Sequence, residues 1–215
     1  LIVLDHHVTN EGFGDIAVVD PESAATGEVV YALLEVLGWD VTPDVAQCLH
    51  TALVTDTGRF QYANTTPRTL EIASRLVAAG ANPNVIGRHV YEEEPFGYLK
   101  AAGKALGRAE LHEGKSLIST VLSHEDLDEA GISWPDTENL IDLLRLAVEA
   151  DTAVLAKAHS DGSTKVSLRS RGDTDVGGLA ASMGGGGHRL AAGFTTNQPP
   201  DRVVAHILDV IGDYR

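Results

Sequence analysis

The stretch Leu1-Ile2-Val3-Leu4-Asp5-His6-His7 joins four apolar residues to three side chains that can bind metals or phosphates. A short apolar run without alternation is typical of a strand buried on both faces of a parallel sheet. Polar residues directly after such a strand lie at its carboxyl end, where open α/β sheets collect their ligands. The stretch therefore predicts an α/β fold, a fully buried strand at residues 1–4 and a candidate site at Asp5, His6 and His7.

The composition excludes several classes of protein. The chain has 215 residues, of which 43% are hydrophobic and 22% charged, as in ordinary globular domains. A net charge of −15 disfavours a protein that coats duplex DNA or long RNA. The single cysteine, Cys48, excludes an intramolecular disulfide and fits a reducing compartment, so we expect a cytoplasmic location. No apolar stretch reaches the roughly 18 residues of a membrane span.

The sequence opens inside the first predicted strand, without an initiator Met or a polar lead-in. We therefore expect the chain to be a piece of a longer protein, with any targeting segment upstream.

Capping residues and apolar periodicity predict a largely helical first half. A second strand is expected at Ile16–Val19. Ser23 would cap a helix that ends at Gly38, and Cys48 would lie in the core on the following helix. Three helices would begin at an X-Pro pair, because the first turn does not use the N–H that proline lacks; the pairs are Thr42-Pro43, Thr66-Pro67 and Asn82-Pro83.

The pattern changes after the acidic run Glu92-Glu93-Glu94. We place the end of the first domain at residue 93, a connector helix over 94–106 and the second domain over 107–215. Strand-like segments flank Glu113-Gly114 and Asp161-Gly162, which predicts two hairpins. With short helices opened by Ser123 and Asp136 and a closing helix from about residue 202, the second domain is predicted to have a mixed sheet.

Metal binding is one interpretation of the first site. Neutral imidazole and carboxylate are natural ligands of Mn²⁺ and Zn²⁺. Because neighbouring strand side chains point to opposite faces, we expect at most one of His6 and His7 to bind the ion, with Asp5 orienting a ring. Asp56, in Thr55-Asp56-Thr57-Gly58, would be a further ligand. The alternatives are two hydrogen-bonded histidines and a turn carboxylate.

A second candidate site is the string Met183-Gly184-Gly185-Gly186-Gly187-His188-Arg189. Glycine permits close approach of the backbone to a ligand, and successive N–H groups can form an anion-binding nest. A helix beginning at residues 190–192 would add its dipole. The alternative is a flexible linker. We expect this segment to bind phosphate.

A basic pair precedes the glycine string. Arg169 and Arg171 would lie on one face of a strand, and arginine suits bidentate phosphate recognition. Surface charge is the alternative and fits Arg171 better. Asp175 is interpreted as a helix N-cap.

These motifs together resemble the DHH–DHHA1 phosphoesterase family. The resemblance rests on Asp5-His6-His7 after a strand, on Thr55-Asp56-Thr57-Gly58 and on Gly185-Gly186-Gly187-His188 with Ala191-Ala192-Gly193. It is strongest to the bacterial nanoRNase and pAp-phosphatase branch and covers essentially the whole chain. The family's Asp-rich motif on an earlier strand and a further lone Asp are absent.

The resemblance implies a fold and an activity. Residues 1–93 would be the C-terminal part of a DHH catalytic domain with a parallel sheet, and 107–215 a smaller DHHA1 substrate-binding domain with a mixed sheet. The substrates would be short oligoribonucleotides (nanoRNA) and 3′-phosphoadenosine 5′-phosphate (pAp), with cyclic di-AMP or pApA cleaved by some members. The chain alone would be inactive without the missing metal ligands. A homodimer is compatible with the resemblance.

The resemblance also implies roles for individual residues. His6 and Asp56 would bind one ion, with Mn²⁺ expected, Mg²⁺ or another divalent ion as the alternative, and two ions in the complete protein. Asp5 would support them, and His7 would face the substrate phosphate. In the second domain the substrate would be held by Gly186, Gly187, His188 and Arg169, with Arg171 nearby.

Two other functions remain open. The chain would serve as a non-catalytic nucleotide- or phosphate-binding module if it bound nucleotides without metal or turnover. A single-strand exonuclease of the RecJ type would call for a basic, aromatic-rich nucleic-acid domain, whereas only 5% of these residues are aromatic.

Overall fold

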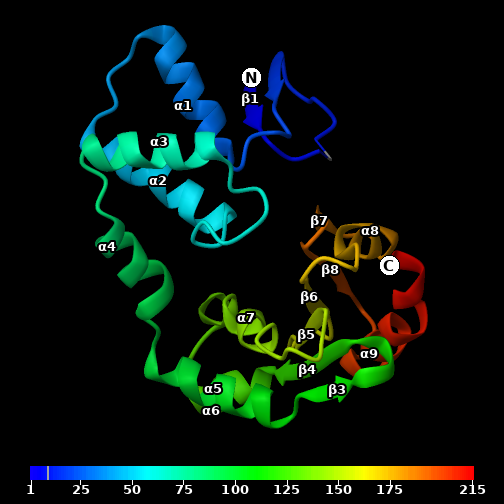
Figure 1. The fold of residues 1–215 in the computed structure, drawn as a ribbon. Coiled ribbons are helices and arrows are strands. Elements are labelled where there is room, and N and C mark those ends of the chain that lie inside the picture. The colour runs from blue at the N-terminus through cyan, green and yellow to red at the C-terminus, as the bar shows by residue number, and fades with distance from the viewer. Residues whose placement is uncertain (9) are drawn as a thin grey trace. The chain divides into compact units, whose positions relative to one another are not determined.

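A computed structural model describes residues 1–8 and 10–215 of the chain (Figure 1). It divides into two compact units, Leu1–Glu93 and Glu94–Arg215, of which the second is the longer in this chain. The first unit holds a two-stranded parallel sheet and the second a six-stranded mixed sheet. The predicted α/β class, with a parallel sheet followed by a mixed one, is confirmed.

The first unit pairs two short strands and packs helices beside them. Strand β1 (Ile2–Asp5) runs parallel to β2 (Ile16–Val19), with Ile2 opposite Ile16. The helices are α1 (Thr26–Leu37), α2 (Pro43–Asp56), α3 (Pro67–Ala78) and α4 (Pro83–Gly87), and a π-helical turn follows at Arg88–Glu92. Full burial of residues 1–4 was a wrong expectation: Leu1 is 72% exposed and Ile2 64%. Within the described residues β1 pairs with one strand only, so its apolar side chains lack the cover of a larger sheet.

The three X-Pro helix starts are confirmed. Each preceding residue accepts a hydrogen bond from a backbone N–H of the first turn, which satisfies a group that the helix itself leaves unpaired; the caps are Thr42, Thr66 and Asn82. The cap expected at Ser23 is wrong, because α1 begins at Thr26 after Ala25 and the Ser23 hydroxyl donates to Asp20 instead.

The core of the first unit lies between α1, α2 and α3. Its largest fully buried side chains are Leu53 and Leu76. Gly27 lets α1 approach α2 closely, since a Cβ there would lie 3.2 Å from the Leu49 carbonyl oxygen. Cys48 on α2 is exposed, so its predicted core position is wrong.

The six strands of the second unit are arranged in the order β3-β4-β5-β6-β8-β7. Their bounds are Glu110–His112 for β3, Leu117–Ser123 for β4, Thr152–Ala158 for β5, Thr164–Ser170 for β6, Gly186–His188 for β7 and Ala191–Thr196 for β8. Only β4 and β5 pair in parallel. Both predicted hairpins, β3–β4 and β5–β6, are confirmed.

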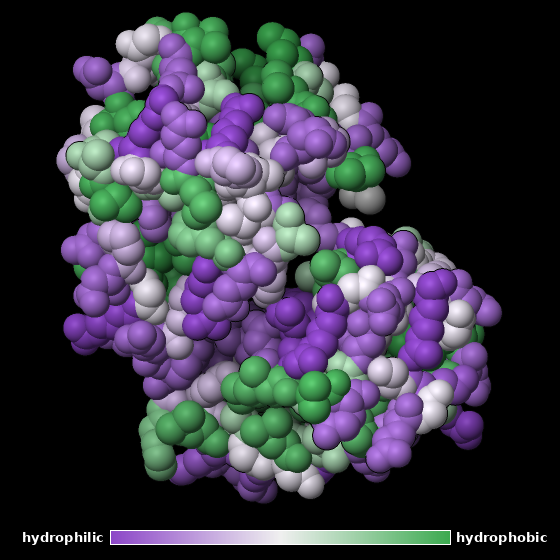
Figure 2. Space-filling view, in the orientation of Figure 1, coloured by the Kyte–Doolittle hydropathy of each residue, from purple (hydrophilic) through white to green (hydrophobic). Residues whose placement is uncertain are grey.

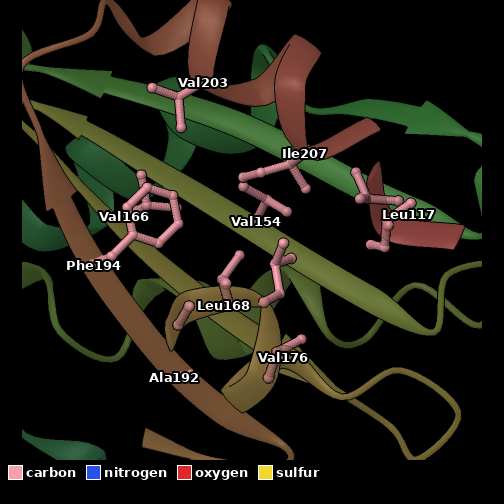
Figure 3. Close-up of a cluster of buried hydrophobic side chains, with 12 residues drawn as sticks. Leu117, Val154, Val166, Leu168, Val176, Ala192, Phe194, Val203 and Ile207 are labelled. Carbon is pink, nitrogen blue, oxygen red and sulfur yellow. The ribbon is translucent and has the colours of Figure 1, made fainter. Parts of the chain in front are cut away.

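Helices cover both faces of this sheet. On one face α5 (Phe96–Gly107), α6 (His124–Ala130) and α7 (Leu140–Leu144) pack over β4, β5 and β6. On the other, α8 (Val176–Ser182) and α9 (Pro200–Val210) bury the cluster drawn in Figure 3, with Val166, Leu168 and Phe194 facing Val203 and Ile207. The helix expected as a connector is therefore part of this unit's core, through Tyr98, Ala101, Ala102 and Ala105 of α5.

Local signals in the second unit mostly agree with the structure. Ser123 caps α6 in a capping box with Asp126, and Asp175 caps α8 by accepting from the Gly178 N–H. The helix expected to open at Asp136 is instead a 3₁₀ turn at Trp134–Thr137, followed by α7. None of the described helices is long and apolar enough to cross a bilayer.

Candidate functional site

His6 and Asp56 lie close together in the first unit. His6 directly follows β1, and Asp56 is the last residue of α2, 50 positions further along the chain. The His6 Nε2 and Asp56 Oδ2 atoms are 3.5 Å apart. The His6 ring is buried, whereas the Asp56 side chain is partly exposed, so solvent reaches the pair from the side of Asp56. The predicted convergence of these two residues is present in the structure.

A backbone carbonyl fixes the orientation of the His6 ring. The His6 Nδ1 lies 3.1 Å from the Ser23 carbonyl oxygen. Because a carbonyl oxygen only accepts, Nδ1 carries a proton, and Nε2 is the ring nitrogen that faces Asp56. Metal-binding histidines are commonly oriented in this way by a group on the second ring nitrogen.

The pair fits a divalent cation. A neutral nitrogen lone pair and a carboxylate oxygen repel each other at 3.5 Å unless the ring is protonated or a cation lies between them. Imidazole nitrogen and carboxylate oxygen are both natural ligands of divalent cations such as Mn²⁺ and Zn²⁺. Two donors do not complete a coordination shell, so His6 and Asp56 alone would not hold such an ion.

Asp5 orients His7 rather than His6. Its Oδ1 accepts from the His7 Nδ1–H at 2.7 Å and from the backbone N–H of His6 at 2.7 Å. Its Oδ2 accepts from the Asn10 amide at 2.6 Å. The Asn10 amide, followed by the His7 ring, holds the pKa of the Asp5 carboxyl well below its usual value. Asp5 is thus an ionised acceptor that fixes the partly exposed imidazole of His7.

The turn after Asp56 contains strained backbone. Gly58, Arg59 and Phe60 have φ values of 54°, 63° and 62°, so three successive residues adopt the left-handed region. Such strain in non-glycine residues is often found beside functional sites. The Arg59 guanidinium lies 4.3 Å from the centre of the Tyr91 ring. The sequence analysis did not single out Arg59; the turn-forming Gly58 was the available signal.

Glu28 in the first turn of α1 was also missed. It is buried, and its Oε1 atom has no hydrogen-bond partner among the described residues. A glutamate at this position is usually exposed and favourable to the helix dipole, so the sequence carries no sign of its burial.

The glycine string is a strand edge rather than an open loop. Gly186–His188 forms β7, which pairs antiparallel with β8 so that Gly187 lies opposite Ala192. A Cβ at Gly187 would lie 2.6 Å from the Ala191 carbonyl oxygen, and one at Gly185 would overlap Gly193 and Phe194. The helix considered for residues 190–192 is wrong, since β8 begins at Ala191. The glycines are thus required in part by close packing of backbone against backbone.

Arg169 and His188 share one face of the sheet. In the register Arg169 of β6 lies opposite Ala191 of β8, which lies opposite His188 of β7. Cross-strand partners point to the same face, so only the small Ala191 separates the two basic side chains. Gly193 and Gly186 lie opposite each other on the same face, where no atom lies within 4 Å of a Cβ added at Gly186. We call this surface, formed by Arg169, Gly186, His188, Ala191 and Gly193, the basic face.

Arg171 does not belong to the basic face. Strand β6 ends at Ser170, and the Arg171 guanidinium donates twice to the Arg145 carbonyl oxygen, at 3.1 and 2.6 Å. The expectation that Arg169 and Arg171 share a strand face is therefore wrong. Arg189, in the turn between β7 and β8, donates to the Gly172 carbonyl oxygen at 2.8 Å.

The chain is similar in sequence and in fold to known proteins. Residues 113–214 match the DHHA1 domain. The chain is 35% identical over 195 residues to the bifunctional oligoribonuclease and PAP phosphatase NrnA of Thermus thermophilus, and 27% identical over 212 residues to the NrnA of Bacillus subtilis. These alignments cover 91% and 96% of this chain.

The chain spans 58% of the length of the Thermus relative and 66% of that of the Bacillus relative. Among solved structures, an exopolyphosphatase-related protein from Bacteroides fragilis superposes with a TM-score of 0.89 at 26% identity. That alignment covers 99% of this chain and 63% of the other. Nearly the whole chain therefore has the fold of a part of that longer protein.

Proposed function

Because the chain belongs to the DHH–DHHA1 phosphoesterase family, we propose that the protein hydrolyses phosphoester bonds in short oligoribonucleotides and in pAp. Its DHHA1 match and its similarity to NrnA proteins support a hydrolase that acts on nucleotides. The observation that carries the catalytic proposal is the 3.5 Å approach of His6 Nε2 to Asp56 Oδ2. Cyclic di-AMP and pApA are further substrates to be compared in the same assay.

We assign the residues of the first unit to the reacting end of the substrate. His6 and Asp56 would hold a divalent cation, with Mn²⁺ expected, and further ligands would come from residues not identified in this chain. Divalent cations in such a site would stabilise charge on the phosphate and acidify a water molecule. Asp5 holds Nδ1 of His7, so Nε2 is the ring nitrogen that would contact a substrate phosphate.

The second unit would bind the other end of the substrate. Arg169 provides positive charge, His188 offers ring nitrogens for hydrogen bonding, and Gly186 leaves room for a nucleotide to approach the backbone. Positioning a substrate at a fixed point removes much of the entropy cost of reaction and limits which substrates fit.

The test is Mn²⁺-dependent release of mononucleotide from pApA by the complete protein. His6→Ala should reduce turnover by at least about a hundredfold and weaken Mn²⁺ binding measured by electron paramagnetic resonance. His206→Ala, at an exposed histidine of α9, is the matched control and should behave as the native protein. Full activity of His6→Ala would reject the assignment.

A metal-independent nucleotide-binding module is the second candidate. It is favoured by one observation: the basic face is formed entirely within the second unit. Titration calorimetry with a 5′-phosphorylated dinucleotide, with and without Mn²⁺, separates the two. Equal binding in both buffers without turnover would favour the module.

A further inference from the structure

A second group of cations lies on the sheet beside the basic face. Lys165, Ser167 and Arg169 alternate along β6 and therefore point to the same side. Lys165 lies opposite Lys157 of β5 in the register. At about 3.3 Å per residue, the Cα atoms of Lys165 and Arg169 are about 13 Å apart along the strand. Because both side chains are long and flexible, the distance between their charged groups can be shorter or longer than this.

Glu138 binds both lysines. Its Oε1 accepts from the Lys157 Nζ at 3.1 Å and from the Lys165 Nζ at 3.2 Å. The Lys157 side chain is only 1% exposed, whereas Glu138 is 53% exposed. Burial lowers the pKa of Lys157, and although burial opposes ionisation of Glu138, the two lysines hold the pKa of this carboxyl below its usual value. Glu138 is therefore an anion placed between two cations at the surface of the sheet.

Asp142 on α7 occupies an equivalent place beside Arg169. Its Oδ1 lies 3.9 Å from the Arg169 Nε and 3.4 Å from the Arg145 Nη1. Figure 2 shows strongly hydrophilic residues at the place where Figure 1 labels α7 and β6. Lys157 and Lys165 thus meet Glu138, while Arg145 and Arg169 meet Asp142, in a chain with a net charge of −15. Exposed cations in such an acidic chain are the places to which an anionic ligand is attracted.

We propose that Glu138 determines substrate length: its carboxylate occupies the place at the exposed Lys165 where a further phosphate of a longer nucleotide would bind. This proposal rests on the proposed function, in which one phosphate binds at Arg169 and His188. A nucleotide with a single phosphate meets only the basic face. A longer one brings a second phosphate toward Lys165, where it meets the negative charge of Glu138 or must displace it. Glu138 thus offsets the charge of Lys165, the exposed lysine that would favour longer chains.

The experiment measures binding by the full chain in EDTA, which removes divalent cations and prevents turnover. The probes are adenosine 5′-monophosphate and the trinucleotide pApApA. Glu138→Gln should tighten pApApA binding about three- to tenfold, the effect of one partly exposed charge pair, and change monophosphate binding less than twofold. The slope of log K against log salt for pApApA should steepen by about 0.7, as for one added phosphate contact on a single strand.

Three further variants make the result specific. Glu129→Gln removes an exposed carboxylate that pairs with Lys104 away from β6, and should leave both affinities unchanged. Lys165→Gln added to Glu138→Gln should abolish the gain. Lys165→Gln alone should leave pApApA binding within twofold of the native value, because Glu138 already neutralises this lysine. That last variant keeps the test valid even if Glu138→Gln fails to fold.

The outcomes separate this inference from the proposed function. Loss of pApApA affinity in Lys165→Gln alone, or no gain in a folded Glu138→Gln protein, would overturn the role of Glu138. If Arg169→Gln leaves monophosphate binding unchanged, the proposed function of the basic face fails instead.

Discussion

Replacing Gly187 by alanine tests whether the glycine string is required by the backbone. Gly187 has a φ of 141°, which L-residues rarely adopt, and its added Cβ would lie 2.6 Å from the Ala191 carbonyl oxygen and 2.6 Å from the Ala192 Cα. A disfavoured φ costs about 1–3 kcal/mol, and forcing a methyl group into packed backbone costs a similar amount. Because β7 is an edge strand that can shift partly, we expect a total of about 2–4 kcal/mol.

Gly186→Ala is the matched control, one residue away on the same strand. No atom lies within 4 Å of its added Cβ, and its φ is not in the left-handed region. The free energy of unfolding should therefore change by less than about 0.5 kcal/mol. If nucleotides approach the backbone here, as proposed, the same methyl group should weaken nucleotide binding although stability is kept.

Urea unfolding followed by tryptophan fluorescence is the assay. Trp134 lies in the second unit, stacked on His159, and Trp39 lies in the first. In a Trp39→Phe background, Trp134 is the remaining tryptophan, so the fluorescence reports the unfolding of the second unit, which contains the glycine string. With a slope of about 2 kcal/mol per M, Gly187→Ala should lower the urea midpoint by about 1–2 M. Equal midpoints for the two alanine variants would refute the packing argument.

Two further predictions concern charged groups of the second unit. Asp126 is buried and paired with Arg108, whose guanidinium holds the pKa of that carboxyl well below its usual range. Asp126→Asn should lower the free energy of unfolding by about 1–3 kcal/mol at pH 7. Because the pKa of Asp126 is depressed in the folded state, the difference in stability between the variant and the native protein should shrink as the pH falls below about 4. Urea titrations at pH 7 and pH 3 measure this difference. Arg169→Gln should weaken the binding of adenosine monophosphate at least tenfold. Arg171→Gln should leave this affinity within twofold of the native value, because the Arg171 guanidinium binds the Arg145 carbonyl oxygen. If calorimetry finds the larger loss of affinity in Arg171→Gln, the assignment of the basic face is contradicted.

Local signals in the sequence predicted much of the fold. A cap and a proline act within one turn of helix, so Thr42, Thr66 and Asn82 indicate helix starts whatever packs around them. The turn signals Glu113-Gly114 and Asp161-Gly162 mark the two hairpins for the same reason. Such features are set by neighbours a few residues away.

Burial could not be predicted as well, because it depends on distant contacts. Cys48 is of a residue type that is usually buried, but it lies on the exposed side of α2. The apolar residues Leu1 and Ile2 are exposed because β1 has a single partner strand within the described residues. Conversely, Glu28 is buried although its type and helix position are those of a surface residue.

The pair His6 and Asp56 shows what a sequence can reveal of a site. Residue type and position made both side chains candidates, the family resemblance selected them as a pair, and the structure places them 3.5 Å apart. The partner of each ring was beyond prediction: His6 is held by the backbone carbonyl of Ser23, and Asp5 fixes His7. A carbonyl acceptor leaves no trace in residue type, since every residue has one.

The glycine string leads to a more general argument. Four successive glycines before a histidine suggest that a ligand approaches the backbone. However, Gly185 and Gly187 are each required by contacts with β8 inside the protein. An added Cβ would meet open space at Gly184 and at Gly186, but Gly184 has a φ of 80°, so only Gly186 lacks an internal reason to be glycine. A motif of this kind therefore combines two constraints, backbone packing and ligand approach, that the sequence cannot separate. Alanine substitution at adjacent glycines separates them, because only a residue required for ligand approach should lose binding while keeping its stability.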